Sequence, residues 1–432
     1  MTLLIHNVTL IDGSGRAPRP HMEVLIGGDC FAAIRPSGTD KAATTVIDGH
    51  GGYLLPGLWE GHIHVTGGPA TGVSFGERAA RAEHVLAEYL QAGVTTLLDL
   101  GGPLDLLCTV RDRQAAAPAR TPELLFSGQL FTGIDGWPVR GRSDHSMAFE
   151  VGDPETARRL VEQHAPQIDF IKCIYDGEPG TPHRLSRPVL TAIVAAAHAA
   201  GRKVLVHVKT GDDLVEAVEA GADGIEHAFV PRDAQDLGEA EAVAALLARA
   251  GVYFCPTLVT WEQFGRARDL NYLRELVQDH IIAEGDVAGI AARLVFNRPS
   301  HAHPADESLA CFKYGTRCIP IFHAAGVKLS VGTDVPMFMA RRSGGLRREL
   351  QLLTRAGLPL MDLIVAATRH NAEKVGRMPG AGTISVGAPA DALLLSADPL
   401  KDVSALIHPN HHVATVRRGE LVTPGPQTPV RG

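Results

Sequence analysis

The chain has 432 residues, of which 45% are hydrophobic and 21% are charged, and its formal net charge is −7 at pH 7. This composition is typical of a globular protein with a sizeable core, and it excludes a disordered or fibrous chain. The mild acidity, without any basic run or stripe, argues against nucleic acids and anionic membranes as partners.

The amino-terminal sequence and the spacing of the cysteines indicate the cellular compartment of the protein. The opening MTLLIHNVTLIDGSG lacks the basic and long apolar regions of a signal peptide, and no later segment has the roughly 20 uninterrupted apolar residues of a membrane span. Six cysteines without CxxC spacing indicate neither a disulfide framework nor a thiolate zinc site. The sequence therefore predicts a cytoplasmic protein.

Both ends of the chain contain closely spaced strand patterns. Residues 1–55 include LLIHNVTLID and EVLIGGDCFAAI, and residues 376–432 include GTISVGAPADALLLSADP and HVATVRRGELV. Gly, Asp and Pro divide these runs into short strands. Because each end alone is too short to bury a core, we expect the two ends to form one small β-sandwich domain.

Residues 56–375 show a different sequence pattern, in which short apolar runs alternate with amphipathic helical stretches. Helices begin at capping residues such as Ser74 and end at glycines such as Gly93. The eight predicted strands are 53–65, 94–100, 123–130, 169–175, 203–209, 224–229, 252–258 and 327–335. Eight βα units predict the α/β class and a (β/α)₈ TIM barrel.

The connection between the seventh and eighth predicted strands is unusually long. Residues 259–325 contain helical patterns and the polar loop NRPSHAHPADES. Connections of this length in a compact domain are usually functional. We expect this segment to be a lid-like insertion over the barrel mouth.

Polar side chains occur at the ends of five of the eight predicted strands. They are His62 and His64 on the first strand, Lys172 on the fourth, His207 on the fifth, His227 on the sixth and Asp334 on the eighth. Side chains at the carboxyl ends of barrel strands meet at one face, and residues two apart on a strand point the same way. Imidazoles with a carboxylate suit Zn²⁺, Mn²⁺, Co²⁺ or Fe²⁺, so the pattern predicts a metal centre.

Lys172 is the unusual member of this set, because divalent metals repel an ammonium group. A buried lysine with a lowered pKa can react with CO₂ to give a carbamate, an anionic ligand able to bridge two metals. Alternatively, Lys172 pairs with a carboxylate beside a single metal. The number of metal ions bound per chain distinguishes the carbamate that bridges two metals from the lysine that pairs with a carboxylate beside one metal.

Several other histidines favour a structural interpretation. His301 and His303 repeat the His-x-His spacing, but they lie in a polar loop with no strand to align their rings. His323 lies on a predicted helix, and the HPNHH run at 408–412 falls in the terminal β-rich segment.

The run LPGLWEGHIHV, followed by Lys172, His207, His227 and GTD at 332–334, resembles the amidohydrolase superfamily. The opening IHNVTLIDGSG, the helical GGLRRELQLLTRAGLPLMDLIVAATRHNAEKVG and the closing GTISVGAPADALLLSADPL extend the resemblance over nearly the whole chain. The chain looks most like imidazolonepropionase-related members and dipeptidase or carboxypeptidase-like members that have a lysine on the fourth strand.

The resemblance implies two divalent metal ions, zinc in the first place, and hydrolysis of an amide-like C–N bond in a small molecule by a homo-oligomer. It assigns His62, His64 and Asp334 to the more buried metal, His207 and His227 to the more exposed one, and carboxylated Lys172 to both. Asp334 would carry a proton from the bridging hydroxide to the leaving amine.

The substrate-binding residues are less well defined by the sequence. Carboxypeptidase-like members often have a T-G-G-H pattern after the third strand, where this chain has FTGIDGWPVRG at 131–141. The candidates for substrate contact are Trp137, Arg140, Tyr175, His183, Arg184, Tyr253 and Thr257. An arginine in this region could bind a substrate carboxylate through two parallel hydrogen bonds.

The leading prediction is hydrolysis of a dipeptide, an N-acyl amino acid or a cyclic amide. One alternative is hydrolysis of another ester-like bond, in a lactone, carbamate or phosphotriester, and another is deamination at a single metal. A non-catalytic binding module is least favoured, because none of the expected ligands is missing from the sequence.

Overall fold

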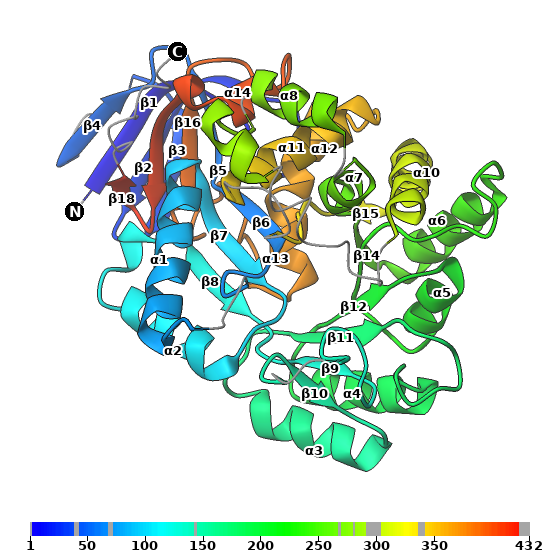
Figure 1. The fold of residues 1–432 in the computed structure, drawn as a ribbon. Helices are drawn as coiled ribbons and strands as arrows, with labels where there is room; N and C mark the ends of the chain where they lie inside the picture. The colour runs from blue at the N-terminus through cyan, green and yellow to red at the C-terminus, as the bar shows by residue number, and fades with distance from the viewer. Residues whose placement is uncertain are drawn as a thin grey trace.

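The computed structural model describes residues 2–38, 43–67, 72–141, 145–266, 269–279, 281–290, 304–335 and 342–422. The protein has an α/β fold with one mixed sheet and two parallel sheets (Figure 1). Figure 1 shows the blue strands from the beginning of the chain beside the orange and red strands from its end. His301 and His303 lie outside the described residues.

The mixed sheet contains strands from both ends of the chain. They are β1 (Thr2–Leu10), β2 (Arg19–Gly27), β3 (Cys30–Pro36), β4 (Thr45–Asp48), β5 (Tyr53–Pro56), β16 (Ala392–Leu395), β17 (His412–Arg417) and β18 (Glu420–Val422). Their order is β18-β17-β16-β5-β1-β2-β3, with β4 paired to β1. Apolar side chains from both ends, such as Val24 and Leu394, form one core cluster. The two ends therefore share a sheet, and their arrangement as a sandwich stays a prediction.

The first predicted barrel strand is divided in the structure, which corrects the range 53–65. Its first part is β5, which pairs with β1 and β16 of the mixed sheet, and its second part is β6 (Leu58–Ile63), which pairs with β7. Gly57 lies between them, and a Cβ atom there would come within 2.3 Å of the Thr95 side chain. The chain thus changes sheets at a point where only glycine fits against the neighbouring strand.

The remaining strands form two parallel sheets that read as continuous apolar runs, as expected for strands covered on both faces. One sheet contains β6, β7 (Val94–Asp99) and β8 (Glu123–Phe126). The other contains β9 (Leu130–Thr132), β10 (Ala148–Glu150), β11 (Ile171–Tyr175), β12 (Val204–Val208), β13 (Gly224–Glu226), β14 (Tyr253–Cys255) and β15 (Lys328–Leu329). Every predicted central strand is present, the third as β8 and β9. Strand β10 was not predicted.

The first and last of these strands are linked by backbone hydrogen bonds. The amide of Gly61 donates to the carbonyl of Val331 at 2.9 Å, and the amide of Thr333 donates to the carbonyl of His62 at 3.1 Å. These bonds place the end of β6 beside the segment that follows β15. As a result, His62 and Asp334 are neighbours although they lie near opposite ends of the central region.

Helices cover the parallel sheets (Figure 1). They are α1 (Phe75–Gln91), α2 (Leu104–Gln114), α3 (Pro154–His164), α4 (Arg187–Ala199), α5 (Gly211–Glu219), α6 (Gly238–Ala250), α7 (Leu258–Arg266), α8 (Leu270–Gln278), α10 (Ala305–Ala324), α11 (Arg342–Arg355), α12 (Leu360–Ala366), α13 (Arg369–Lys374) and α14 (Ser404–Ile407). The predicted capping box is present, since Ser74 and Glu77 each bond the other's backbone amide. Within the described residues, no helix combines the length and hydropathy needed to cross a membrane.

The long segment 259–325 contains most of α7 and all of α8 and α10. It is fastened to α11 by Arg348, whose guanidinium binds Glu262 on α7 and Glu275 on α8 at 2.6 and 2.7 Å. Arg348 and Glu262 are almost completely buried. The insertion is therefore held to the protein by charged groups as well as by apolar packing.

Candidate metal centre

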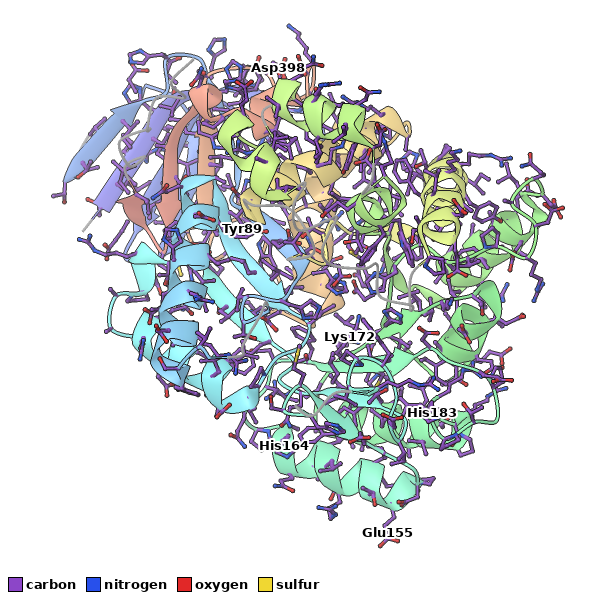
Figure 2. All side chains as sticks on the ribbon, in the orientation of Figure 1. Tyr89, Glu155, His164, Lys172, His183 and Asp398 are labelled. Atoms are coloured by element: carbon purple, nitrogen blue, oxygen red, sulfur yellow. The ribbon has the colours of Figure 1, made fainter. Side chains whose placement is uncertain are left out.

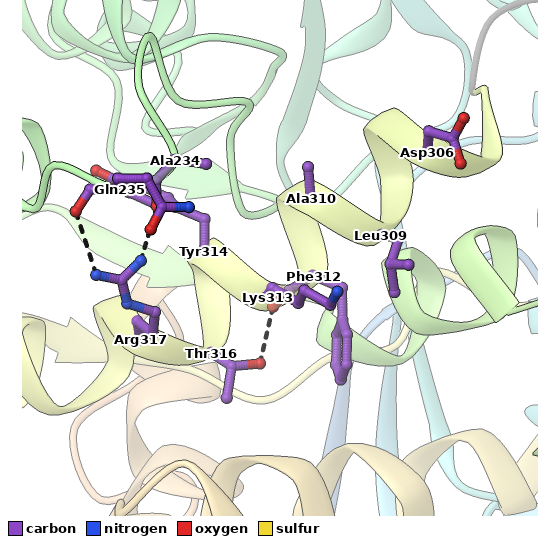
Figure 3. A pocket seen from close by; sticks show the side chains of 10 residues that line it. All are labelled: Ala234, Gln235, Asp306, Leu309, Ala310, Phe312, Lys313, Tyr314, Thr316 and Arg317. Carbon is purple, nitrogen blue, oxygen red and sulfur yellow. Dashed lines mark hydrogen bonds between the residues drawn. The ribbon is translucent and has the colours of Figure 1, made fainter.

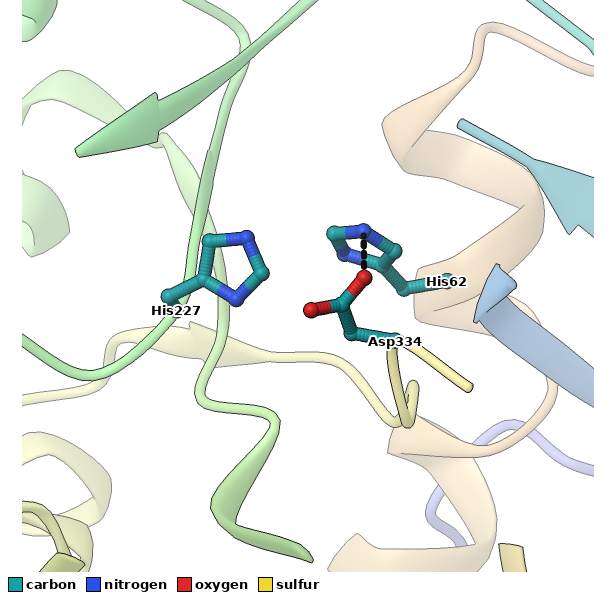
Figure 4. A group of neighbouring side chains, drawn as sticks. All are labelled: His62, His227 and Asp334. Atoms are coloured by element: carbon teal, nitrogen blue, oxygen red, sulfur yellow. Dashed lines mark ion pairs between the residues drawn. The ribbon is translucent and has the colours of Figure 1, made fainter. Parts of the chain in front are cut away.

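Three side chains from different strand ends meet at one point. His62 lies on β6, His227 directly follows β13, and Asp334 follows β15. One ligand atom of each lies within 4.8 Å of the corresponding atoms of the other two. Figure 4 shows the Asp334 carboxylate between the two rings, with an ion pair to His62.

His64 and His207 complete this cluster. The Nε2 atom of His64 lies 3.1 Å from Oδ1 of Asp334, and Nε2 of His62 lies 3.4 Å from the same oxygen. The ring centroid of His227 is 4.9 Å from that of His62 and 4.5 Å from that of His207. The structure thus brings together five of the six side chains that the sequence singled out.

Lys172, the sixth, lies on β11, and Figure 2 shows it near the centre of the molecule. Its ammonium nitrogen is buried and has no hydrogen-bond partner among the described residues. Burial lowers the pKa of Lys172 to about 8, although the nearby carboxylates of Glu226 and Asp334 oppose this change. Buried polar groups in folded proteins nearly always have a hydrogen-bond partner. The unpaired amine of Lys172 therefore indicates a site that binds a further group.

The backbone at this cluster adopts a conformation that is rare for residues other than glycine. The φ angles are 81° at His227, 61° at Asp334 and 46° at Thr257. Each residue follows a strand end, where a left-handed turn changes the direction of the chain. At His227 the turn interrupts strand alternation, so Glu226 and His227 both reach His62 although they are adjacent in sequence.

The Nδ1 atoms of three histidines are held by partners outside the cluster. His62 Nδ1 lies 2.7 Å from Oε2 of Glu226, and His64 Nδ1 lies 2.8 Å from the carbonyl oxygen of Gly101. His227 Nδ1 lies 2.8 Å from Oγ1 of Thr257. Such contacts hold a ring in place and leave Nε2 available to a metal.

The electrostatics of the cluster favour a bound cation. Burial opposes ionisation of Asp334, but His62 and His64 hold the pKa of this carboxyl well below its usual value. Burial lowers the pKa of His62 and so favours its neutral form, in which Nδ1 donates to Glu226 and the Nε2 lone pair faces the Asp334 oxygen, which also accepts. Two facing acceptors repel unless a positive charge lies beside them. The residues present therefore fit a divalent metal ion.

His227 is suited to the same role. Burial drives the pKa of its imidazole well below the usual value, and the neighbouring His207 lowers it further. A neutral imidazole has the free lone pair that metal binding requires. The ring of Trp261 on α7 lies beside this imidazole, with a centroid distance of 6.4 Å and a nearly perpendicular orientation.

Two residues beside the cluster, Glu226 and Lys374, were missed by the sequence analysis. Glu226 Oε1 lies 3.1 Å from Nζ of Lys374 on α13, and both side chains are fully buried. The signal available in the sequence was a glutamate inside the apolar run GIEHAF, next to a predicted ligand. A charged residue in such a run is rarely buried without a partner.

Glu226 also belongs to a second group of potential ligands, with His62 and Cys255, whose atoms lie within 4.8 Å of one another. Two observations argue against a metal there. The Lys374 ammonium already supplies the positive charge beside Glu226, and burial raises the pKa of the Cys255 thiol well above its usual value. A protonated thiol is a poor metal ligand.

Two of the predicted substrate-binding residues, Thr257 and Tyr253, bond other residues of the protein, and their roles in substrate binding stay predictions. Thr257 is buried and its hydroxyl group bonds His227. Tyr253 lies at the amino end of β14, opposite to the strand ends that form the cluster, and its hydroxyl group donates to Glu373 at 2.9 Å.

The role of Arg184 in binding a substrate carboxylate stays a prediction, and in the structure its guanidinium contacts other residues of the protein. Its guanidinium lies over the Tyr175 ring at 4.1 Å and donates to Asp213 on α5 at 2.6 Å. The Tyr175 hydroxyl group bonds Glu216 on the same helix. Both candidates thus bond carboxylates of α5.

The remaining candidates lie in loops. His183 Nδ1 is 2.9 Å from the carbonyl oxygen of Ile134. Trp137 is partly buried and packs with Leu130 and other apolar residues. Arg140 is exposed. These three residues remain substrate-binding candidates only as a prediction.

A hollow of about 610 Å³ lies elsewhere on the surface, along α10 (Figure 3). Leu309 and Phe312 line it, together with Arg317, whose guanidinium donates to the carbonyl oxygens of Ala234 and Gln235. None of the predicted metal ligands lines this hollow. It is therefore separate from the cluster described above.

Comparison with known proteins covers nearly the whole chain. Residues 53–422 match the sequence profile described as the amidohydrolase family. The imidazolonepropionase of Stenotrophomonas maltophilia is 24% identical to this chain over 433 residues, which is 96% of this chain and 95% of that protein.

Two crystal structures show the same fold. One, of a protein described as an amidohydrolase, is 25% identical, with a TM-score of 0.80 over 98% of this chain and 100% of that chain. The other, of a Xaa-Pro dipeptidase with bound methionine, is 20% identical, with a TM-score of 0.77 over 98% of this chain and 100% of that chain.

Proposed function

The chain belongs to the amidohydrolase family, and on this basis we propose that it hydrolyses an amide-like C–N bond in a small molecule. The observation that carries the proposal is the convergence of His62, His227 and Asp334 within 4.8 Å of one another. The substrates that we favour are dipeptides, N-acyl amino acids and cyclic amides, because the chain resembles both an imidazolonepropionase and a Xaa-Pro dipeptidase.

We assign the cluster to two divalent metal ions, zinc in the first place, with manganese, cobalt or iron as alternatives. The proposed ligands are His62, His64, His207, His227, Asp334 and Lys172 as a CO₂-derived carbamate. The buried unpaired amine of Lys172 and the facing acceptors of His62 and Asp334 support this assignment. When bound, such metals polarise a substrate carbonyl and lower the pKa of water.

Asp334 is the proposed proton carrier. Its carboxylate is held ionised by the two histidines that it contacts, so it can accept a proton from the attacking water. It then delivers the proton to the nitrogen of the leaving amine as the C–N bond breaks. The Nδ1 contacts of His62 and His64 hold their rings beside this carboxylate.

We further propose that the parallel strands close into a (β/α)₈ barrel of residues 56–375, flanked by a β-domain made of residues 1–55 and 376–432. In this arrangement the segment 259–325 covers the barrel mouth, and Trp261 on α7, beside His227, is the contact that supports it. The cytoplasmic location and the homo-oligomeric state stay predictions.

The proposal is tested by stripping the purified protein of metal, reloading it with Zn²⁺ and screening dipeptides, N-acyl amino acids, cyclic amides and lactones. We expect metal-dependent C–N hydrolysis and two metal ions per chain in elemental analysis. Release of ammonia from an amino heterocycle with one metal per chain would identify a deaminase instead. Hydrolysis that survives both metal removal and Asp334→Asn would overturn the mechanism.

A further inference from the structure

A buried chain of three side chains leads from the candidate metal centre to helix α13. His62 Nδ1 lies 2.7 Å from Glu226 Oε2, and the other oxygen of Glu226 lies 3.1 Å from Lys374 Nζ. The side chains of Glu226 and Lys374 are completely buried, and that of His62 is 1% exposed. Lys374 also lies 3.4 Å from the hydroxyl group of Ser330.

Each carboxylate oxygen of Glu226 thus has one partner. A carboxylate that is paired with an ammonium group only accepts hydrogen bonds, so the hydrogen of the neutral His62 ring resides on Nδ1. The lone pair is then on Nε2, the atom that lies 3.4 Å from Asp334 Oδ1. Glu226 therefore determines which nitrogen of His62 faces the cluster.

The free-energy cost of burying the charges of Glu226 and Lys374 indicates that the pair has a function other than stabilising the fold. Moving an ammonium and a carboxylate out of water is expensive, and apolar residues of similar volume often stabilise a fold equally well or better. Here the ion pair stands directly behind a predicted ligand, and the left-handed conformation of His227, with φ of 81°, allows Glu226 to reach that ligand. An apolar pair could not orient the His62 ring.

We propose that Glu226 is a positioning residue that fixes the tautomer and orientation of His62 for metal binding, and that Lys374 holds Glu226 in place. This inference rests on the proposed function, because it takes His62 to be a metal ligand. Carboxylates that accept a hydrogen bond from a ligating histidine typically change metal affinity by about 10- to 100-fold when removed.

The test uses the double variant Glu226→Leu/Lys374→Met, which removes both charges at similar volume and therefore leaves no unpaired buried ion. Metal-free protein is titrated with Zn²⁺ against a chelator, and with Co²⁺ while its visible absorption spectrum is recorded. We expect Zn²⁺ affinity to fall by about 10- to 100-fold and the Co²⁺ spectrum to change. In Glu226→Gln/Lys374→Met the amide oxygen can still accept from His62, so affinity should be partly restored.

The matched control is Asp391→Asn/Arg417→Met, which removes another largely buried ion pair, at 2.9 Å, in the mixed sheet. Its Zn²⁺ affinity and Co²⁺ spectrum should equal those of the wild type. If Glu226→Leu/Lys374→Met is folded and binds both metals as the wild type does, the inference is wrong. If it does not fold, Glu226→Ala/Lys374→Met decides, because alanine also removes the acceptor of the His62 hydrogen bond, and wild-type Zn²⁺ affinity in that folded variant would overturn the inference.

A separate outcome concerns the proposed function. If the wild-type protein binds neither Zn²⁺ nor Co²⁺, the metal centre itself is refuted, and the role of Glu226 with it. Weak binding by the Glu226 variants alone, with normal binding by the wild type and by the control, supports the positioning role.

Discussion

His64 Nε2 lies 3.1 Å from Oδ1 of Asp334, and this contact joins the first and last strands of the parallel sheets. The same oxygen lies 3.4 Å from Nε2 of His62. Burial opposes the charge on Asp334, yet these two imidazoles keep the pKa of its carboxyl group well below the usual value. The Asp334 carboxylate therefore contacts two histidines and stays ionised in the interior of the protein.

Replacing Asp334 by Asn should abolish most of the catalysis. An amide cannot accept the proton of the attacking water, and general-base catalysis typically contributes about 10²- to 10⁴-fold, so kcat should fall by that factor. The measurement is steady-state hydrolysis of the best substrate from the screen. Asp362→Asn, at an exposed position on α12, should keep the wild-type kcat. A folded Asp334→Asn protein with near wild-type kcat would contradict the proposed role.

Carboxylation of Lys172 should depend on pH in a defined direction. CO₂ reacts with the neutral amine and releases a proton, and burial lowers the pKa of this amine to about 8. The neutral fraction therefore rises from about 1% at pH 6 to about 90% at pH 9. At a fixed concentration of dissolved ¹³CO₂, the carbamate carbon signal of the metal-free protein should appear faster at pH 9 than at pH 6. Lys172→Met should show no such signal.

The absence of a carbamate signal from the wild type at either pH would favour the one-metal alternative. In that case elemental analysis should give one firmly bound metal per chain, and Lys172→Met should bind metal as the wild type does. A carbamate together with two metals per chain would instead support Lys172 as a shared ligand.

Arg348→Met should destabilise the protein by up to about 3–5 kcal/mol, because it removes the bidentate partner of the buried carboxylate of Glu262 and leaves Arg266, at 3.5 Å, as its nearby cation. Arg348 Nε and NH2 form two parallel bonds to Glu262, at 2.8 and 2.6 Å. The free energy of unfolding is measured by urea denaturation. Arg355→Met is the control, since Arg355 lies on the same helix and contacts Glu275 and Asp279 but is 53% exposed, so its loss should cost about 1 kcal/mol or less. Equal effects of the two changes would show that burial of Arg348 is unimportant.

His412 should make the protein less stable in acid. Burial lowers its pKa to about 4, against an ordinary value of 6.5, so the folded protein prefers the neutral ring. The stability that depends on this ring is fully present above pH 6.5 and is lost as the pH falls from 6.5 to 4. The loss is at most about 1.4 kcal/mol per pH unit, and partial exposure of the ring reduces it.

The check is the free energy of unfolding of metal-free protein at pH 7, 6, 5 and 4. His412→Gln keeps a donor for the carbonyl oxygen of Leu406, which accepts from His412 at 2.9 Å, but it cannot titrate. Its stability should fall less steeply below pH 6.5 than that of the wild type. The control His50→Gln, at a side chain that is 86% exposed, should follow the wild type. Parallel curves for His412→Gln and the wild type would refute the assignment.

Local patterns predicted the elements well because their causes are local. Ser74 and Glu77 form a capping box from three residues of spacing, and the strand Val94–Asp99 follows from an apolar run that is buried on both faces. The division of 53–65 into two strands was missed, because it depends on the packing of Gly57 against Thr95.

The sequence by itself determined which polar side chains stand at the ends of the strands, because apolar burial and two-residue alternation act within a few residues along the chain. Only the tertiary structure decided which atoms meet. It set His62 between Glu226 and Asp334, and it turned Arg184 toward Asp213. The physical reason is that these contacts depend on how distant strands align and how helices pack on them, and both are fixed by the shape of the whole core.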